Sequence, residues 1–516
     1  MIPISSVRSP TISATSLPMA TSASERYNAL VAWVEAAGGS LHPAVEIYID
    51  EDTEGSLRVK QGQSISPGDS IVKLPLVRSL SFLNAISGHP DFPAAASLGV
   101  AAPNSNGAIS EGESLAGATF FPTRFLRETP PHVIGRFFLI QQHLLGAASP
   151  WAPYIQTLPQ PESNTGGLLP CAWPAEDVEC LCGTNAYVAV QEINATLENE
   201  YTAAIQLLSS AISDSNNGVK ATEYTAELYK WAYCIFASRS FRQSLTIPAA
   251  TALSLTAKPD DFSVLLPLFD MGNHHPQAKT AWKTPEESNS SEAGKPAFCE
   301  LQTGQPYSSG QQVFNNYGAS KTNAELLLGY GFVLAESDEF HNDYVHIKTR
   351  PGATQHLSPE QQLASTHLVS LQPISDPSSL AVRARSLTNP NPDRIMSCYT
   401  HVQDSLVASL YEAVCQAKGL SSAVGSSGGG VTLAKILAGD IPDELTDEII
   451  NALGTKLSID LEKIEAAEAE QGGEAAPRNG NQELALLYRR QCKRVLENAL
   501  ASLSGEEYEA ESEEEE

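Results

Sequence analysis

The stretch Leu266–Trp282, LPLFDMGNHHPQAKTAW, joins an apolar segment to a cluster of polar side chains. Asn273, His274 and His275 stand side by side at the end of the apolar segment, directly before a proline. A metal site, a catalytic base and a cofactor-binding loop all use such residues. Adjacent side chains of an extended chain point apart, and no third ligand follows at a suitable spacing, so we reject the metal site. The other two interpretations stay open at this point.

A second stretch, some forty residues further on, carries the other unusual residues. It runs from Gln311 to Phe332 and reads QQVFNNYGASKTNAELLLGYGF. A Tyr-Gly pair at Tyr317 follows a strand-like run, and a Tyr-Gly-Phe triplet that begins at Tyr330 ends a helical one. Each short pattern alone occurs in many unrelated proteins, so the information lies in their order along one chain.

The region before these stretches predicts one helix and several short strands. In RYNALVAWVEAAGG, which begins at Arg26, the apolar residues recur at helical spacing and Gly38 ends the pattern. The β-branched runs AVEIYID, SLRVK and SIVKLP follow, and the turn SPGD precedes the last of them. We predict a compact sheet of short strands.

The middle of the chain predicts helices enclosed between two sets of strands. Apolar residues recur every three or four positions from about Phe121 to Phe241. Strand-like runs return at 278–284, 297–303, 311–318 and 344–349. We therefore expect one β domain whose two halves meet in space around a helical excursion. After about residue 350 the pattern is helical to the end.

The composition limits the classes of function. The chain has 516 residues, of which 42% are apolar, and a formal net charge of -28. An acidic chain lacks the positive surface that nucleic-acid phosphates require, and it favours basic partners. Eight of the 60 acidic residues lie in the segment 505–516, for which we predict a solvated, disordered tail. We expect no nucleic-acid partner.

The sequence predicts neither a metal framework nor a membrane anchor. The eight cysteines lack the paired spacing of a zinc site and indicate reduced thiols of an intracellular protein. No apolar run reaches the roughly 18 residues that a membrane-spanning helix needs. Residues 1–24 are rich in Ser and Thr with Arg8 as their one basic residue, which predicts a disordered leader. We expect a monomer in the cytoplasm, the nucleus or both, and an organellar leader stays open.

In this order, the two stretches resemble the SET-domain protein methyltransferases, and more closely the branch typified by the Rubisco large-subunit methyltransferase. Supporting segments are HPAVEIYIDEDTEGSLRV, PWAPYIQTLP, YKWAYCIFASRSF and LYRRQCKRVLENAL. The resemblance spans roughly residues 26–503 and is firmest at 262–346. It implies an α+β fold: a SET-type fold of short β-strands with an inserted helical subdomain, followed by an all-helical C-terminal domain.

The resemblance also implies domain limits. We expect the leader at residues 1–24 and the SET domain at 25–348, with its helical insertion at about 121–261. A helical substrate-binding-like domain is expected at 349–504, before the acidic tail at 505–516.

The resemblance assigns roles to four residues. In this family an Asn-His pair binds S-adenosylmethionine, which implies that Asn273 and His274 do so here. Tyr317 matches the catalytic tyrosine, which also contacts the cofactor, and Arg239 matches an arginine directed at the cofactor's carboxylate. Taken alone, the four residues read as a turn asparagine, a buried core histidine, a packed aromatic and a surface arginine at a helix end.

Four further residues follow with more open alternatives. By resemblance Phe332 contacts the cofactor and Tyr330 the substrate lysine; core packing is the alternative for both, and for Tyr330 it is equally typical. The family's Gly-x-Gly turn reads EGSL here: Gly55 is kept, Ser56 follows it, and the second glycine is replaced. Both are still expected to contact the cofactor, and the missing second glycine leaves the strength of binding open.

These observations predict an S-adenosylmethionine-dependent protein-lysine N-methyltransferase that acts on a non-histone protein and needs no metal. The cysteine-rich segment that follows the SET core in many histone-directed members is missing here. Two alternatives remain: a protein-histidine methyltransferase on the same scaffold, and a catalytically weak SET protein that serves as a partner-binding module. The sequence does not identify the target residue or the number of methyl groups added.

Overall fold

The computed structural model of the protein describes most of the chain. It covers residues 22–50, 54–93, 95, 99–103, 121–161, 169–211, 219–247, 261–285, 297–335, 340–348, 365–379, 394–420, 431–471 and 476–505. Nearly all of the predicted leader 1–24 and of the predicted tail 505–516 lies outside these residues.

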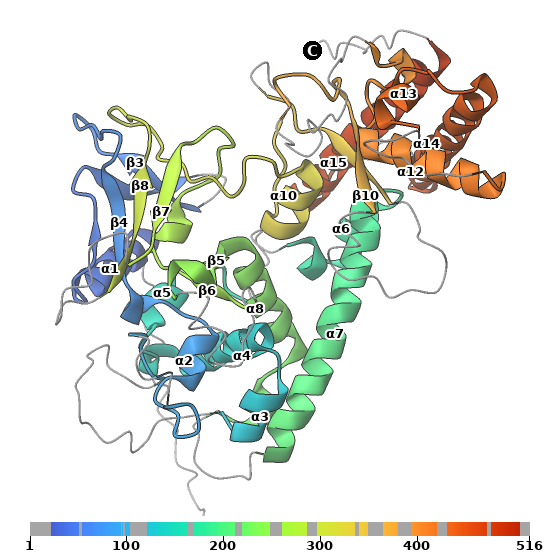
Figure 1. Cartoon of the computed structure of the whole chain (residues 1–516). Helices are drawn as coiled ribbons and strands as arrows, with labels where there is room; N and C mark the ends of the chain where they lie inside the picture. Colours follow the sequence, from blue (N-terminus) through green and yellow to red (C-terminus); the bar gives the residue numbers. More distant parts are fainter. Residues whose placement is uncertain are drawn as a thin grey trace, which may run out of the picture.

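Short antiparallel strands form several small sheets (Figure 1). One sheet has four strands in the order β1-β4-β8-β7, and β2-β3, β5-β6 and β9-β10 pair separately. The strands are β1 (Ser40–Leu41), β2 (Val45–Asp50), β3 (Glu54–Val59), β4 (Ser70–Pro75), β5 (Ser240–Arg242), β6 (Ser263–Leu265), β7 (Thr280–Lys283), β8 (Phe298–Thr303), β9 (Tyr344–Lys348) and β10 (Thr366–Ser370). Because β4 pairs with β8, the two predicted sets of strands do meet in space.

The helices between the two sets of strands lie where the apolar periodicity predicted them. They are α3 (Thr123–Glu128), α4 (Pro131–Leu144), α5 (Ala152–Ile155), α6 (Ala175–Val178), α7 (Asn185–Ala211) and α8 (Ala226–Arg239). The long helix α7 runs from the level of α3 to the helices at the C-terminal end (Figure 1). It therefore spans most of the height of the molecule in this view.

Most of the remaining helices begin at a residue whose side chain accepts a hydrogen bond from the first turn. The helices of this group are α1 (Ala23–Glu35), α2 (Phe82–Ile86), α10 (Asn323–Tyr330), α12 (Asp404–Ala417), α13 (Leu433–Leu437), α14 (Asp443–Glu470) and α15 (Gly480–Ser504). Ser22 and Glu25 form a capping box at the start of α1, and Gly38 beyond its end has a φ of 86°. The predicted first helix is thus confirmed.

Two segments differ from the predicted pattern. The run 311–318 is not a strand, because it makes only isolated bridges, such as Arg58 with Gln312. Strand β10 lies in the region predicted to be purely helical, where all five of its residues pair with β9. A five-residue run is too short for periodicity to separate a strand from a helix turn.

Buried apolar side chains form two main clusters. The larger one gathers α1, the four-stranded sheet and helices α2 to α5 and α8. The second one holds most of the apolar residues after position 345, and it also contains Ala324 and Leu327 of α10. Helix α10, which carries part of the second stretch, therefore shares this cluster with the C-terminal helices, and its Asn323 Nδ2 donates to Gln491 Oε1 of α15 at 3.2 Å.

The N-terminus of α15 is tied to α6 by one buried carboxylate. Asp177 Oδ1 accepts hydrogen bonds from Asn479 Nδ2 at 3.0 Å and Gln482 Nε2 at 2.8 Å, and Oδ2 accepts one from Asn481 Nδ2 at 3.0 Å. These bonds lower the pKa of Asp177 in spite of its burial. A negative charge is favoured there because it faces the positive end of the helix dipole.

In the part of the chain that the structure describes, no helix is both long and apolar enough to span a membrane.

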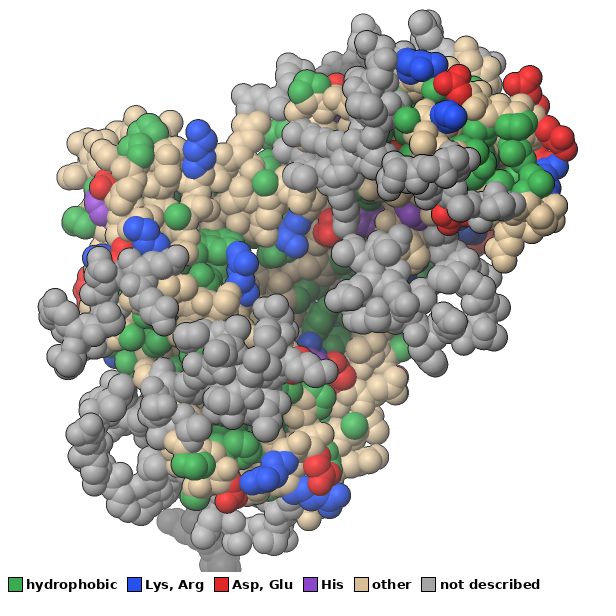
Figure 2. Space-filling model, in the orientation of Figure 1, with side chains coloured by type: hydrophobic (Ala, Val, Ile, Leu, Met, Phe, Trp, Pro, Cys, Tyr) green, Lys and Arg blue, Asp and Glu red, His purple; other side chains and the backbone are tan. Residues whose placement is uncertain are grey.

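On the visible face, acidic side chains gather with a few basic ones at the outer end of the C-terminal helices (Figure 2). Among the charged residues of this part of the chain, Lys418 bridges Glu444 at 2.7 Å and Glu448 at 2.6 Å.

Candidate active site

The two stretches singled out in the sequence lie side by side. His274 and Asn315 form a parallel bridge. The backbone N–H of Asn315 donates to the carbonyl of Asn273 at 2.8 Å, and the N–H of His275 donates to the carbonyl of Asn315 at 3.0 Å. Residues 273–275 and 313–315 therefore form a short crossing point between distant parts of the chain.

Two asparagines that were not predicted as site residues, Asn315 and Asn316, hold this crossing point. Asn315 is fully buried; its Oδ1 accepts from Trp282 Nε1 at 3.1 Å and its Nδ2 donates to the carbonyl of Phe269 at 3.4 Å. Asn316 Nδ2 donates to the carbonyl of Pro276 at 2.9 Å. The available signal was the Asn-Asn pair directly before Tyr317, since side-chain amides can replace backbone partners in an irregular segment.

Tyr317 is fixed by three contacts with the first stretch. Its hydroxyl donates to the carbonyl of Gly272 at 3.0 Å, and its backbone N–H donates to His274 Nδ1 at 3.1 Å. The His274 and Tyr317 rings are nearly parallel, with centroids 5.1 Å apart and 18° between their planes. Burial raises the pKa of the Tyr317 hydroxyl, although Arg239 acts in the opposite direction. The side chain is a neutral, oriented phenol.

His274 is a neutral imidazole with a defined proton. Burial, together with the charges of His275 and Lys321, lowers its pKa to about 4. Because Nδ1 accepts the hydrogen bond from Tyr317, the proton of the neutral ring lies on Nε2. The ring therefore serves as an acceptor that fixes Tyr317, and it adds no positive charge near pH 7.

The Tyr-Gly-Phe triplet closes an aromatic cluster around Tyr317. Gly331 ends α10 with a φ of 79°, a left-handed conformation that turns the chain so that the residues on both sides face Tyr317. Tyr330 stacks on Tyr317 with centroids 4.7 Å apart, and Phe332 lies 6.5 Å from Tyr317 and 6.1 Å from His274. We call these four residues, His274, Tyr317, Tyr330 and Phe332, the aromatic cluster.

The altered glycine turn lies against Asn273. Ser56 on β3 is fully buried, and its Oγ accepts a hydrogen bond from Asn273 Nδ2 at 2.8 Å. A Cβ added at Gly55 would lie 2.4 Å from the ring of Tyr27, so this glycine leaves room for an aromatic side chain of α1. Gly55 is therefore required for packing, and Ser56 directly orients the predicted asparagine.

Arg239 is the last residue of α8 and lies next to Asp270. Its Nη1 donates to the carbonyl of Asp270 at 3.3 Å and lies 3.5 Å from Asp270 Oδ2. That carboxylate oxygen also accepts from the hydroxyl of Tyr154 at 2.8 Å. Burial raises the pKa of Asp270, and Arg239 and Tyr154 oppose this effect. Asp270 and Tyr154 were not predicted as site residues; an acid three positions before Asn273 was the available signal.

Asp270 Oδ1 has an unusual environment. It is buried and has no hydrogen-bond partner among the described residues, and Arg239 makes hydrogen bonds there only through Nη1. Leu268, two residues earlier, has a φ of 70°, a conformation that no other non-glycine residue of the described ranges adopts. Unpaired buried polar atoms and backbone strain are typical of binding sites.

The structure thus brings most of the predicted residues into one region. Four of them, His274, Tyr317, Tyr330 and Phe332, form the aromatic cluster. Asn273 directly precedes His274 in the chain, and Ser56 contacts Asn273. Arg239 adjoins through Asp270, and Gly55 precedes Ser56 on β3. Within the described ranges, no group of three or more His, Cys, Asp or Glu side chains is arranged to hold a metal ion.

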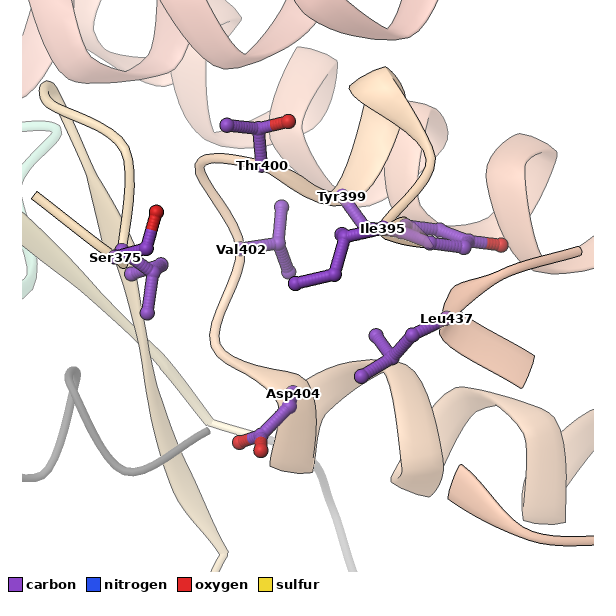
Figure 3. A pocket seen from close by; sticks show the side chains of 8 residues that line it. Ser375, Ile395, Tyr399, Thr400, Val402, Asp404 and Leu437 are labelled. Atoms are coloured by element: carbon purple, nitrogen blue, oxygen red, sulfur yellow. The ribbon is translucent and has the colours of Figure 1, made fainter. Parts of the chain in front are cut away.

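A separate small cavity lies in the C-terminal part, away from the predicted site residues (Figure 3). Its volume is about 50 Å³. It is lined by Ile374, Ser375, Ile395, Tyr399, Thr400, Val402, Asp404 and Leu437.

Comparison with curated proteins finds lysine methyltransferases. No family model matches the chain. The chain is 32% identical to the ribosomal lysine N-methyltransferase of Schizosaccharomyces pombe over 207 residues, which are 40% of this chain and 32% of that protein. It is 28% identical to the chloroplastic fructose-bisphosphate aldolase-lysine N-methyltransferase of Arabidopsis thaliana, over 42% of this chain and 39% of that protein. An actin-histidine N-methyltransferase of Danio rerio is 28% identical over 39% of this chain and 29% of that protein. The chain spans between about a third and two fifths of the length of the first two relatives.

Comparison with solved structures covers nearly the whole chain. The SET domain of the Rubisco large-subunit methyltransferase, bound to lysine and AdoHcy, aligns with a TM-score of 0.57 at 14% identity, over 93% of this chain and 91% of that chain. The structure of the same methyltransferase bound to AdoMet gives a TM-score of 0.54 at 16% identity, over 93% and 92%. The predicted SET-type fold, with small antiparallel sheets and many helices, is confirmed.

Proposed function

We propose that this chain, which has the fold of the Rubisco large-subunit methyltransferase, is an S-adenosylmethionine-dependent protein-lysine N-methyltransferase that acts on a non-histone protein. The observation that carries the proposal is the contact between the Asn273–His274 segment and Tyr317 beneath Tyr330 and Phe332. The names of the relatives support the reaction class, since lysine methylation recurs among them with ribosomal and aldolase targets.

The residues beside Asn273 suit the amino-acid end of S-adenosylmethionine, which carries one ammonium and one carboxylate. Asp270 Oδ1 is a buried acceptor without a partner among the described residues, and it complements an ammonium. Arg239 uses Nη1 for Asp270, so the rest of its planar guanidinium complements a carboxylate. Asn273, whose amide is oriented by Ser56, adds a further polar contact.

The aromatic cluster suits a lysine side chain. When bound, S-adenosylmethionine supplies a methyl group on a positively charged sulfur. The faces of Tyr317, Tyr330 and Phe332 would hold an alkylammonium before it loses its proton to water. The Tyr317 hydroxyl, fixed by the carbonyl of Gly272, would orient the neutral amine without ionising. Positioning therefore supplies most of the rate, because the reacting atoms must approach within about 3–3.5 Å in line.

Transfer of a radiolabelled methyl group to proteins of a cell extract tests the proposal. We expect labelling by the unmodified protein and a loss of about 100-fold in rate for Tyr317→Phe, since misplacing a reacting group by about 1 Å costs that much. Asn273→Ala should lose labelling through weaker cofactor binding. Equal labelling by all three proteins would rule out this site.

A histidine acceptor is the second candidate on the same scaffold. The similarity to an actin-histidine N-methyltransferase supports it, because that relative matches nearly as much of this chain as the lysine enzymes do. Mass spectrometry that locates the added methyl group distinguishes the two. A methylated histidine without a methylated lysine would replace our proposal.

The binding-module alternative was based on the altered glycine turn. The contact between Ser56 and Asn273 makes this alternative weaker, because Ser56 of that turn orients a predicted cofactor residue.

We keep the domain limits as a proposal as well: a SET domain at 25–348 with its insertion at about 121–261, and a partner-binding helical domain at 349–504. Helices α12 to α15 share one buried apolar cluster, which supports a C-terminal unit, and the cluster also includes residues before 349, such as Leu327 and Ile347. We further propose that the enzyme is an intracellular monomer. The acidic composition supports the absence of a nucleic-acid partner.

A further inference from the structure

Lys321 lies at the edge of the aromatic cluster in a fixed orientation. Its Nζ is placed over the ring of Tyr330, 5.4 Å from the ring centroid. A Cβ added at Gly318 would lie 3.2 Å from Cγ and Cε of Lys321, so the aliphatic stem crosses this glycine closely. The stem is held on one side by Gly318 and the ammonium on the other by Tyr330.

The ammonium of Lys321 has no carboxylate partner among the described residues. Several other described lysines do pair with acids: Lys418 pairs with Glu444 and Glu448, and Lys493 pairs with Glu468 at 3.0 Å. Lys321 is half-buried, and His274 in the same cluster is neutral. A half-buried ammonium held over an aromatic ring is available to pair with an incoming carboxylate, and such a pair is screened less than one in open solvent.

We propose that Lys321 selects the target by pairing with an acidic side chain two or three residues from the lysine that is methylated. This inference rests on the proposed function, because it takes the position beside Tyr317 as the place of the target amine. It names a specificity-determining residue and a chemical class of target sequence: a lysine with a neighbouring Asp or Glu.

The distances fit this spacing. The Lys321 ammonium is at most about 10 Å from the centre of the Tyr317 ring, because it lies 5.4 Å and the Tyr317 ring centre 4.7 Å from the centre of the Tyr330 ring. An extended chain advances about 3.3 Å per residue, so a carboxylate two or three residues along reaches this position. A basic residue of the target at this position would be repelled by Lys321. The net charge of -28 means that the molecule as a whole does not attract acidic sequences. The preference must therefore be local.

Methylation of a cell extract with S-adenosylmethionine that carries a trideuterated methyl group tests the inference with the full chain. Mass spectrometry maps each modified lysine, and the identified target is then used to measure kcat and KM. Four variants are compared: Lys321→Met keeps the stem, Lys321→Arg keeps the charge, Lys321→Glu reverses it, and Lys279→Met is the control. Lys279 is exposed and contacts Gly304 and Gln305 instead of the aromatic cluster.

We expect an Asp or Glu within three residues of the modified lysine. Lys321→Met should raise KM roughly tenfold with little change in kcat, Lys321→Glu should raise it further, and Lys321→Arg should restore it. Modified lysines without an acidic neighbour, or equal KM values for Lys321→Met and Lys279→Met, would overturn the inference and leave the proposed function intact. An extract that the unmodified protein does not label would overturn both.

Discussion

At the scale of single residues, the buried histidine of the aromatic cluster has the clearest consequence for stability. The pKa of His274 is about 4 in the folded chain and about 6.5 in an unfolded one. The stabilisation linked to this lowered pKa is fully present above pH 6.5, where the imidazole is neutral in both the folded and the unfolded chain. As the pH falls from 6.5 to 4, only the unfolded chain gains the proton, and the stabilisation is lost.

The size of this contribution is about 3 kcal/mol, since each unit of pKa difference corresponds to about 1.4 kcal/mol. Urea unfolding at pH 7.5, 6 and 5 should therefore show a steeper loss for the unmodified protein than for His274→Asn. Asparagine keeps an acceptor near the position of Nδ1 and does not titrate. Identical pH dependence in the two proteins would show that His274 is not buried in its neutral form.

Gly55 should not tolerate a methyl group. Gly55→Ala places a Cβ 2.4 Å from the ring of Tyr27, and we expect a loss of about 1–3 kcal/mol of unfolding free energy from this overlap. In a Tyr27→Ala background the same change should cost much less. Gly329→Ala is the control, because nothing lies within 4 Å of its added Cβ and alanine is the better helix residue. Additive effects of the Gly55 and Tyr27 changes would contradict the contact.

Most of the predicted site residues could be located from the sequence because their chemistry depends on residue type and order. Asn315, Asn316 and Tyr154 could not, because their roles come from long-range hydrogen bonds with Trp282, Pro276 and Asp270. No local pattern distinguishes a buried asparagine that holds a loop from one in a surface turn.

At the scale of secondary-structure elements, the contact between α6 and α15 depends on one carboxylate. Asp177→Ala leaves three side-chain amides without their acceptor, and we expect it to cost about 3 kcal/mol of unfolding free energy. Glu176→Ala on the same short helix is the matched control, since Glu176 is exposed. Chemical denaturation measures both, and equal midpoints would contradict a stabilising role for Asp177.

The elements that repeat a clear period were predictable, and the irregular ones were not. Helix α7 and strand β4 follow from their apolar spacing and from turn residues at their ends. The residue pattern of the run 311–318 predicts a strand. In the structure this run lies between β3 and the segment after η8 (Phe269–Met271), and it forms only isolated bridges with them. Val313 and Asn315 of this run are buried by tertiary contacts that a local pattern does not contain.

At the scale of the whole molecule, the site depends on the C-terminal helices. Ala324 and Leu327 of α10 belong to the same buried cluster as residues of α12, α14 and α15, and α10 carries Tyr330 at its end. A chain that ends at residue 348 would expose this apolar surface. We expect such a truncated protein to aggregate or to lose cooperative unfolding, as measured by light scattering and calorimetry. A monodisperse truncated protein with the original melting temperature would contradict this dependence.

The central claim is that two distant segments of the chain form one cofactor site, and calorimetric titration with S-adenosylmethionine tests it most directly. We expect a Kd on the order of micromolar for the unmodified protein and at least about tenfold weaker binding for Asn273→Ala. Tyr317→Phe, which retains the ring and its stacking, should bind within about threefold of the unmodified protein while transferring the methyl group poorly. Absence of binding by the unmodified protein, or unchanged binding by Asn273→Ala, would contradict the account.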